Sequence, residues 1–138
     1  MEFRRPFKAV AGALLALAGC AAQTTANDSA VCDAYNAGRS HVEVVAAGRI
    51  TRVLGIANGR VSPHEGFLMK LDSGCNVEVR VEVNTDLAGT FPAAQGEPVT
   101  VKGEYEYYPR GGVIHWTHHD PRFRHEAGFI EIGGKTYQ

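Results

Sequence analysis

Hydrophobic and polar residues alternate along most of this chain with a period of two, rather than the 3.6 of an amphipathic helix. Between Val77 and Val83 every odd position is valine and every even position is charged. Similar alternation marks the segments 42–53, 67–71, 99–107, 113–117 and 129–132. One dry face and one wet face are typical of antiparallel strands, so the pattern predicts five or six of them.

A short helix is expected ahead of these strands, because Asp28 or Ser29 can cap a helix that Gly38 ends. Gly48 and Gly103 lie inside two of the predicted strands, where glycine marks a tight corner. An insertion separates the third and fourth strands. We therefore predict an all-β fold of small α content, an OB-like barrel of five to six antiparallel strands with a short N-terminal helix. An open sandwich would produce the same alternation.

The first 19 residues have the organisation of a signal peptide. Basic residues precede a continuous apolar run at 9–18, which is too short to span a bilayer permanently. Leu17-Ala18-Gly19-Cys20 resembles the lipobox of bacterial lipoproteins. This resemblance implies cleavage before Cys20, lipidation of its thiol and acylation of its new amine. An ordinary secretory signal that happens to carry a cysteine is the alternative.

We therefore expect three parts, a signal peptide at 1–19, a flexible tether at 20–29 and one OB-like domain at 30–138. The tether is small and polar, with nothing to bury. Because no aspartate follows Cys20 directly, the lipoprotein resemblance implies a lipid anchor in the outer membrane if the host is Gram-negative. The domain would then face the periplasm.

The net charge of the chain disfavours some classes of binding partner. The leader holds three of the 14 basic and one of the 15 acidic residues, which leaves 11 basic and 14 acidic side chains and a formal net charge of −3. This balance argues against non-specific nucleic-acid binding, whose affinity comes mainly from cations that face phosphates. It also provides no attraction to anionic lipids, so membrane attachment would depend on the acyl chains.

Two cysteines remain once Cys20 is assigned to lipid. An oxidising envelope favours pairing of Cys32 with Cys75, whereas two free thiols are the alternative. Their spacing resembles neither a redox CxxC motif nor a zinc knuckle. We expect a structural disulfide, which would stabilise the fold by roughly 2–4 kcal/mol.

Four of the six histidines fall between positions 115 and 125, and His64 lies in a separate loop. Neutral imidazoles beside carboxylates suit zinc or another transition metal, and imidazole also transfers protons near pH 7. The candidate ligands for a small molecule or a metal ion are His64, His115, His118, His119, Asp120 and His125, and the candidate proton-transfer residues are Glu65 and Asp120. His115 and His119 would lie about 13 Å apart in an extended strand. A shared site therefore requires a bend, which Asp120-Pro121 favours.

A structural role is the alternative for this segment. His115 would be a hydrogen-bonded strand residue, Asp120 would accept backbone N–H groups in the following turn, and His118 and His119 would be solvated. Trp116 is expected to be the main packing side chain of the barrel. No Ser-His-Asp order, HExxH helix, phosphate-binding glycine loop or paired-carboxylate motif supports a named enzyme class.

The segments 103–121, 128–130 and 135–138 resemble an uncharacterised family of small bacterial envelope proteins. That family is marked by a His-Trp-Thr-His motif, which corresponds here to residues 115–118. The resemblance implies an exported OB-like domain and brings no established activity.

Three functions fit these residues. The leading hypothesis is a non-catalytic envelope lipoprotein that binds a small ligand or a transition metal such as zinc at the histidine cluster. The second is a metal-dependent hydrolase acting on phosphodiesters, in which Asp120 or Glu65 handles the proton. The third is a structural or interaction protein of the outer membrane.

Overall fold

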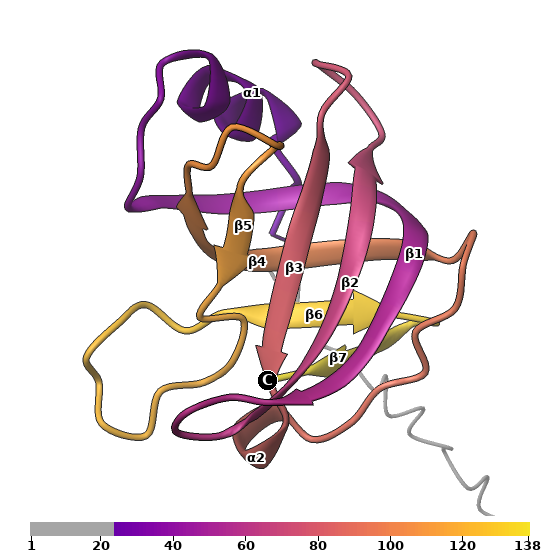
Figure 1. Cartoon of the computed structure of the whole chain (residues 1–138), viewed down its shortest axis with the longest axis vertical. Coiled ribbons are helices and arrows are strands. Elements are labelled where there is room, and N and C mark those ends of the chain that lie inside the picture. Colours follow the sequence, from indigo (N-terminus) through magenta and orange to yellow (C-terminus); the bar gives the residue numbers. More distant parts are fainter. Residues whose placement is uncertain (1–23) are drawn as a thin grey trace, which may run out of the picture.

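Seven strands and two short helices form residues 24–138, the part of the chain that the computed structural model describes (Figure 1). The helices are α1 (Asp28–Asn36) and α2 (Thr85–Ala88). The strands are β1 (Val42–Asn58), β2 (Pro63–Leu71), β3 (Glu78–Asn84), β4 (Pro98–Glu106), β5 (Val113–His115), β6 (Phe129–Ile132) and β7 (Lys135–Tyr137). The expected signal peptide and Cys20 lie outside the described residues. No helix within 24–138 has the length and apolar character needed to cross a membrane.

Five of the strands close into a ring. The sheet runs in the order β1-β2-β3-β5-β4, and β4 pairs back onto β1 along eight residue pairs, from Val42↔Tyr105 to Arg49↔Pro98. This topology confirms the all-β, OB-like fold with a short N-terminal helix. Two details differ from the prediction: β3 and β5 pair in parallel, and a short strand, β7, extends the sheet beyond β6.

The core lies inside the ring and follows the alternation of the strands. Val79, Val81 and Val101 are fully buried, whereas the neighbouring positions of β3 and β4 are at least partly exposed. Tyr105 is also fully buried, and its hydroxyl donates a hydrogen bond to the carbonyl oxygen of Gly111 at 3.0 Å. Burial raises the pKa of Tyr105 to about 12. The apolar faces predicted from the sequence therefore do face one common interior.

The sequence predicts tight corners at Gly48 and Gly103, and the structure shows that both lie where neighbouring strands approach closely. A Cβ atom at Gly103 would overlap the backbone carbonyl oxygen of His115, and one at Gly48 would overlap that of Lys70. A side chain at position 103 would push β5 away from β4. Gly103 is therefore required for the position of His115.

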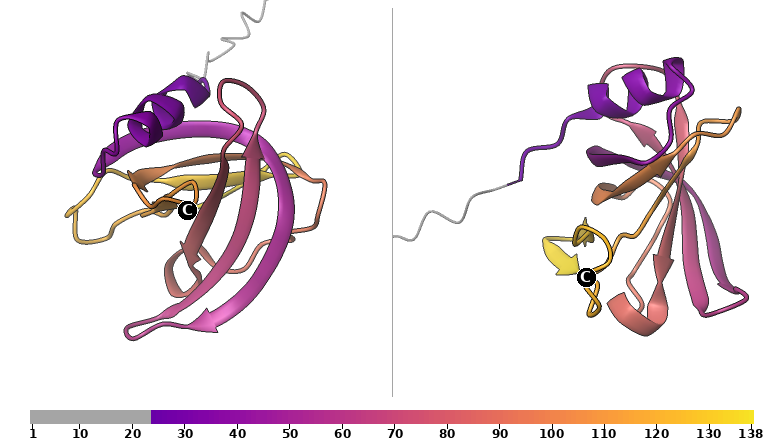
Figure 2. Two further views of the ribbon diagram at one scale, coloured as in Figure 1. Left: turned by 45° about the horizontal axis from the view of Figure 1, so that its top comes forward. Right: turned by 90° about the vertical axis from the view of Figure 1, so that its left-hand side faces the viewer.

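Helix α1 packs at one end of the ring, whereas α2 and the β1–β2 turn lie at the opposite end (Figure 2). Cys32 of α1 is bonded to Cys75, 43 residues away in the sequence, which confirms the expected disulfide. Asp28 does not cap the helix, contrary to the prediction. Its buried carboxylate accepts hydrogen bonds from the backbone N–H groups of Ala47 and Ser73 at 2.8 and 3.1 Å, and so joins α1 to the sheet.

Candidate functional site

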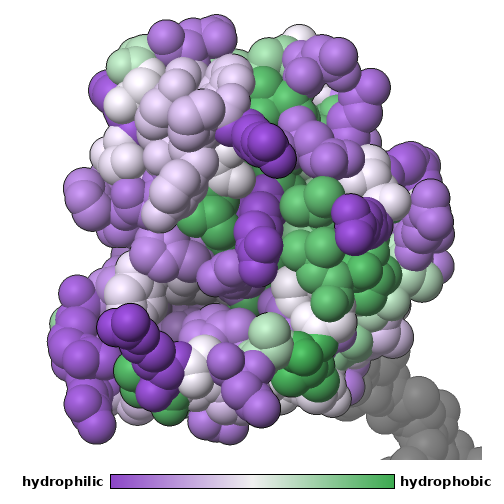
Figure 3. Space-filling view, viewed as in Figure 1, coloured by the Kyte–Doolittle hydropathy of each residue, from purple (hydrophilic) through white to green (hydrophobic). Residues whose placement is uncertain are grey.

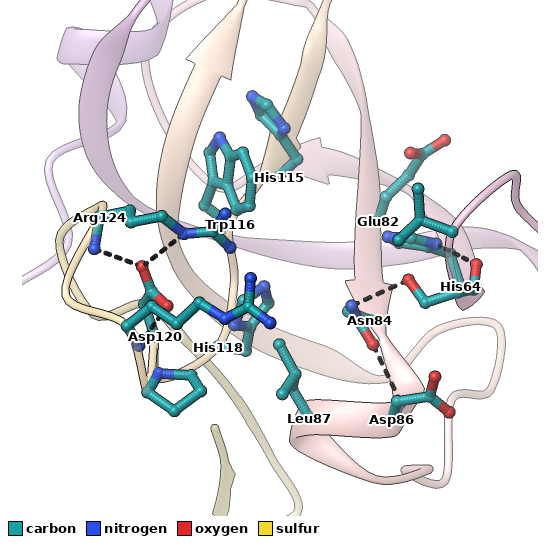
Figure 4. A pocket seen from close by; sticks show the side chains of 14 residues that line it. His64, Glu82, Asn84, Asp86, Leu87, His115, Trp116, His118, Asp120 and Arg124 are labelled. Carbon is teal, nitrogen blue, oxygen red and sulfur yellow. Dashed lines mark hydrogen bonds and ion pairs between the residues drawn. The ribbon is translucent and has the colours of Figure 1, made fainter.

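A pocket of about 630 Å³ opens at the end of the ring opposite α1, between the loop 116–128 on one side and the end of β3 with α2 on the other (Figure 4). The molecular surface is hollowed in this region, among mainly hydrophilic side chains (Figure 3). Four of the residues predicted from the sequence line the pocket, namely His64, His115, His118 and Asp120. The structure therefore brings residues from distant segments together at one place.

His118 and His64 each have a ring nitrogen held by the backbone. Nδ1 of His118 lies 2.8 Å from the carbonyl oxygen of His119, and Nδ1 of His64 lies 3.0 Å from that of Ser62. Because a carbonyl oxygen only accepts, Nδ1 is the donor, and Nε2 carries the lone pair in the neutral ring. His118 is 4% exposed, and this burial lowers its pKa. His118 therefore presents a buried imidazole whose Nε2 can accept a hydrogen bond, rather than a solvated ring.

Asp120 organises the loop that carries these residues. Its buried carboxylate accepts hydrogen bonds from the backbone N–H groups of Arg122 at 2.8 Å, of Arg124, and of His125 at 3.2 Å. Burial alone would raise the pKa of Asp120, but these bonds bring it below its usual value. Asp120 thus has the structural role that was one of the two expectations for it.

The remaining predicted residues do not line the pocket. His119 is exposed, and the ring of His125 packs on Trp116 with centroids 4.5 Å apart. Glu65 is buried on β2, where burial raises its pKa and its carboxylate accepts from the backbone N–H of Phe91 at 3.4 Å. In the described part of the chain, no three of the predicted ligands bring their ligand atoms within 4.8 Å of one another.

Trp116 does not fill the interior, contrary to the expectation from the sequence. Its φ is 55°, a left-handed conformation that is unfavourable for a bulky residue, and 37% of the residue is exposed. Strand β5 ends at His115, and the buried residues Tyr105 and Ile114 occupy the core instead. The indole ring packs against the rings of His115 and His125, at centroid distances of 5.3 and 4.5 Å.

A second group of ionisable residues, which the sequence pattern does not reveal, lies on the outer face of β4. Glu104 and Glu106 share this face because they are two residues apart on a strand. His115 is the cross-strand neighbour of Glu104, and His41 stands immediately before β1. These four residues, His41, Glu104, Glu106 and His115, are called the His/Glu cluster below.

Distances within the His/Glu cluster are short. Nδ1 of His41 lies 3.1 Å from Oε1 of Glu104 and 2.8 Å from Oε1 of Glu106. Nε2 of His115 lies 3.6 and 3.7 Å from the same two oxygen atoms. The ligand atoms of His41, Glu104 and Glu106 all fall within 4.8 Å of one another, so this group could hold a metal ion.

The electrostatics of the cluster reflect this proximity. The hydrogen bond to Glu104 and the charge of Glu106 raise the pKa of His41. Burial would raise the pKa of Glu104, but hydrogen bonds with His41 and Glu106 and the nearby His115 lower it below its usual value. Nε2 of His115 is buried and has no hydrogen-bond partner in residues 24–138. Nε2 of His115 is therefore a potential metal ligand that forms no hydrogen bond within residues 24–138.

Comparison with known proteins gives a family but no function. A family model described as "Protein of unknown function (DUF3465)" matches residues 13–138. No curated protein and no solved structure matches the chain.

Proposed function

The chain belongs to the DUF3465 family, whose function is unknown, and we propose from its geometry that it is a binding module for a transition metal ion such as zinc. The metal would be held by the His/Glu cluster, rather than by the histidines of the loop 116–128. One observation carries this proposal, the convergence of two imidazole nitrogens on the same pair of carboxylate oxygens.

The spacing of the donor atoms supports a metal of zinc's size. Ligand atoms bound at 2.0–2.1 Å around a tetrahedral zinc ion lie about 3.3 Å apart. The nitrogen–oxygen distances from His41 are 2.8 and 3.1 Å, close to that value, and those from His115 are longer, 3.6 and 3.7 Å; the ligand atoms that all lie within 4.8 Å of one another are those of His41, Glu104 and Glu106, without His115. A mixed imidazole and carboxylate set suits zinc, and divalent copper binds such donors more tightly still.

The unpartnered nitrogen of His115 is the second line of support. A buried nitrogen without a hydrogen bond is unfavourable, because it has lost its bond to water and the nearest carboxylate oxygens, 3.6 and 3.7 Å away, lie beyond hydrogen-bond distance. A metal ion between the two carboxylates would accept its lone pair and would also neutralise the repulsion between Glu104 and Glu106. The exposed ring of His41, 78% accessible, gives the ion a path from solvent.

We also propose that the protein is a lipoprotein of the cell envelope, anchored in the outer membrane through Cys20. Support comes from the lipobox-like Leu17–Cys20 segment and from the disulfide, since disulfides persist in oxidising compartments. Cells fed a labelled fatty acid should label the wild-type protein in the outer-membrane fraction. The variant Cys20→Ala should stay unlabelled, and equal labelling of both proteins would contradict the anchor.

Isothermal titration of the purified full chain with Zn²⁺, Cu²⁺ and Ni²⁺ tests the metal site. We expect one ion per chain, and Glu106→Gln and His115→Ala should each weaken zinc binding by at least tenfold. His119→Ala is the matched control, because it removes an exposed imidazole outside the cluster. Absence of binding, or a loss in the His119 variant alone, would contradict the proposal.

A metal-dependent hydrolase is the second candidate, and one observation favours it. His115 belongs to the His/Glu cluster and also lines the pocket, so a bound ion would lie beside a cavity large enough for a small substrate. A bound metal ion lowers the pKa of its water and makes a nucleophile near pH 7. EDTA-sensitive cleavage of bis(4-nitrophenyl) phosphate, abolished in Glu104→Gln, would establish this reaction, and an inert zinc-loaded chain would exclude this phosphodiesterase activity.

A further inference from the structure

A second pocket, of about 650 Å³, lies on the outer face of the ring, over β1, β2 and β3. On β3 its lining residues, Glu78, Arg80 and Glu82, alternate with the buried Val79 and Val81 and therefore point away from the core. Figure 3 shows this face, on which strongly hydrophilic side chains stand next to hydrophobic ones over these strands. The pocket is therefore separate from the interior of the ring.

The register of the strands places two arginines of this pocket in one row. Arg52 of β1 is the cross-strand partner of Leu68 of β2, and Leu68 is also the partner of Arg80 of β3. Because neighbouring strands lie about 4.8 Å apart, the Cα atoms of the two arginines are separated by roughly 10 Å. Both side chains line the pocket, so their guanidinium groups can reach a single anion between them.

A third arginine comes from the loop between β4 and β5, which carries Tyr108 and Arg110, both exposed and both lining the pocket. The carbonyl oxygen of Gly112 in this loop accepts a hydrogen bond from the backbone N–H of Arg80 at 3.1 Å. The φ of Gly112 is 84°, and a Cβ atom there would overlap the ring of the buried Tyr105. The loop is therefore anchored against β3, which holds its exposed side chains at the pocket.

Two of the three arginines have no anionic partner in the protein. In the part of the chain that the structure describes, Arg52 and Arg110 form no ion pair. Two carboxylates also line the pocket, and both are already bonded. Glu78 accepts a hydrogen bond from a threonine hydroxyl of β1 at 2.6 Å, and Glu82 pairs with Nε of Arg80 at 2.7 Å. Guanidinium groups around one cavity repel one another unless an anion lies between them, so the pocket favours an anionic ligand.

The pocket also offers apolar surface beside its arginines. Leu54 and Leu68 are both partly exposed there, and Tyr108 is 59% exposed. An aromatic ring of this kind stacks on nucleobases and packs against other flat, partly apolar rings. An inorganic anion would leave this surface in water, whereas an organic anion with a ring would cover it.

We propose that this pocket binds a small organic phosphate, namely the phosphate monoester of a sugar or of a nucleoside. The phosphate lies between Arg52, Arg80 and Arg110, because guanidinium groups donate parallel hydrogen bonds to phosphate oxygens. A phosphate monoester carries about two negative charges near pH 7, which matches the two arginines that have no partner. The ring of the ligand lies on the leucines and on Tyr108.

This inference goes beyond the proposed metal site, since none of the four residues of the His/Glu cluster lines the second pocket. Calorimetric titrations of the full chain in EDTA test it, because EDTA prevents phosphate from binding through a metal ion. The ligands are glucose 1-phosphate, adenosine monophosphate, inorganic phosphate, and the two uncharged parent compounds, glucose and adenosine.

We expect at least one of the two esters to bind, roughly tenfold or more tightly than inorganic phosphate and than its own uncharged parent. The ester that binds more tightly identifies the ring as a sugar or a nucleoside. Absence of binding by both esters at millimolar concentration would overturn the proposal. Equal affinity for inorganic phosphate would reduce the pocket to a plain anion site, and equal affinity for the uncharged parent would remove the role of the arginines. Either result would also overturn the proposal.

Substitutions test the two halves of the pocket separately. Arg52→Gln and Arg110→Gln should each weaken binding of the ester by roughly tenfold, the loss expected for hydrogen bonds to a charged group. Tyr108→Ala should weaken binding of the ester and leave the weaker binding of inorganic phosphate unchanged. Arg60→Gln and Phe123→Ala are matched controls, since both residues are exposed outside the pocket lining. Equal effects of the pocket variants and the controls would contradict the assignment.

The phosphate and metal proposals fail independently of each other. Ester binding is measured without metal, and zinc binding does not involve the arginines of the second pocket, so a negative result in one titration leaves the other standing. Circular dichroism of each variant verifies that the fold is retained.

Discussion

Removal of the Cys32–Cys75 disulfide should lower the free energy of unfolding by about 4 kcal/mol. The bond joins residues 43 apart in sequence, and the chain-entropy relation for a loop of this length gives about that value at 25 °C. The bond ties α1, which is otherwise held mainly by Val31, Ala34 and the hydrogen bonds of Asp28, to the β2–β3 turn. The double variant Cys32→Ala/Cys75→Ala is the perturbation.

Urea unfolding of this double variant, followed by circular dichroism and by the fluorescence of the single tryptophan, measures the loss. With an m value of about 1.5 kcal/mol/M, the midpoint should fall by roughly 2–3 M. The wild-type chain in dithiothreitol is the control and should give the same midpoint. A loss below about 1 kcal/mol would refute the loop-closure reasoning. Zinc binding by the folded variant should be unchanged, because neither cysteine belongs to the His/Glu cluster.

Substitutions at three buried positions test the strand contact, the core and the loop. Gly103→Ala should push β5 off β4, lower the free energy of unfolding by about 1–3 kcal/mol and weaken zinc binding through the displaced His115; an unchanged zinc affinity in calorimetry would contradict this. Tyr105→Phe should leave the carbonyl oxygen of Gly111 without its donor and lower the free energy of unfolding by about 1–2 kcal/mol, with zinc affinity unchanged. Because burial lowers the pKa of His118, the unfolded chain binds more protons below about pH 6.5, so stability falls as the pH drops from about 7.5 to 5.5. His118→Gln should reduce this fall in the urea midpoint, and parallel midpoint curves would contradict the assignment.

The sequence by itself determined the β-sheet, its buried face and the disulfide. Alternation between Val77 and Val83 is a local property of a strand, since successive side chains point to opposite faces whatever lies around them. The pairing of Cys32 with Cys75 followed from their number and the expected compartment. The sequence contains no comparable signal for the parallel pairing of β3 with β5 or for strand β7. Strands β5 and β7 have only three residues each, too few for an alternation of apolar and polar positions to be recognised.

Only the tertiary structure decided which ionisable groups meet. The histidines of the loop 116–128 are neighbours in sequence, yet Asp120 folds the loop so that His118 faces the pocket while His119 faces solvent. His41 and Glu104 are 63 residues apart in sequence and are joined by the closing of β4 onto β1. The alternation of apolar and polar residues determines on which face of its strand a side chain lies. It does not determine which other strand pairs with that strand. That neighbour is set by the order and register of strands in the closed ring, which depend on contacts between distant parts of the chain.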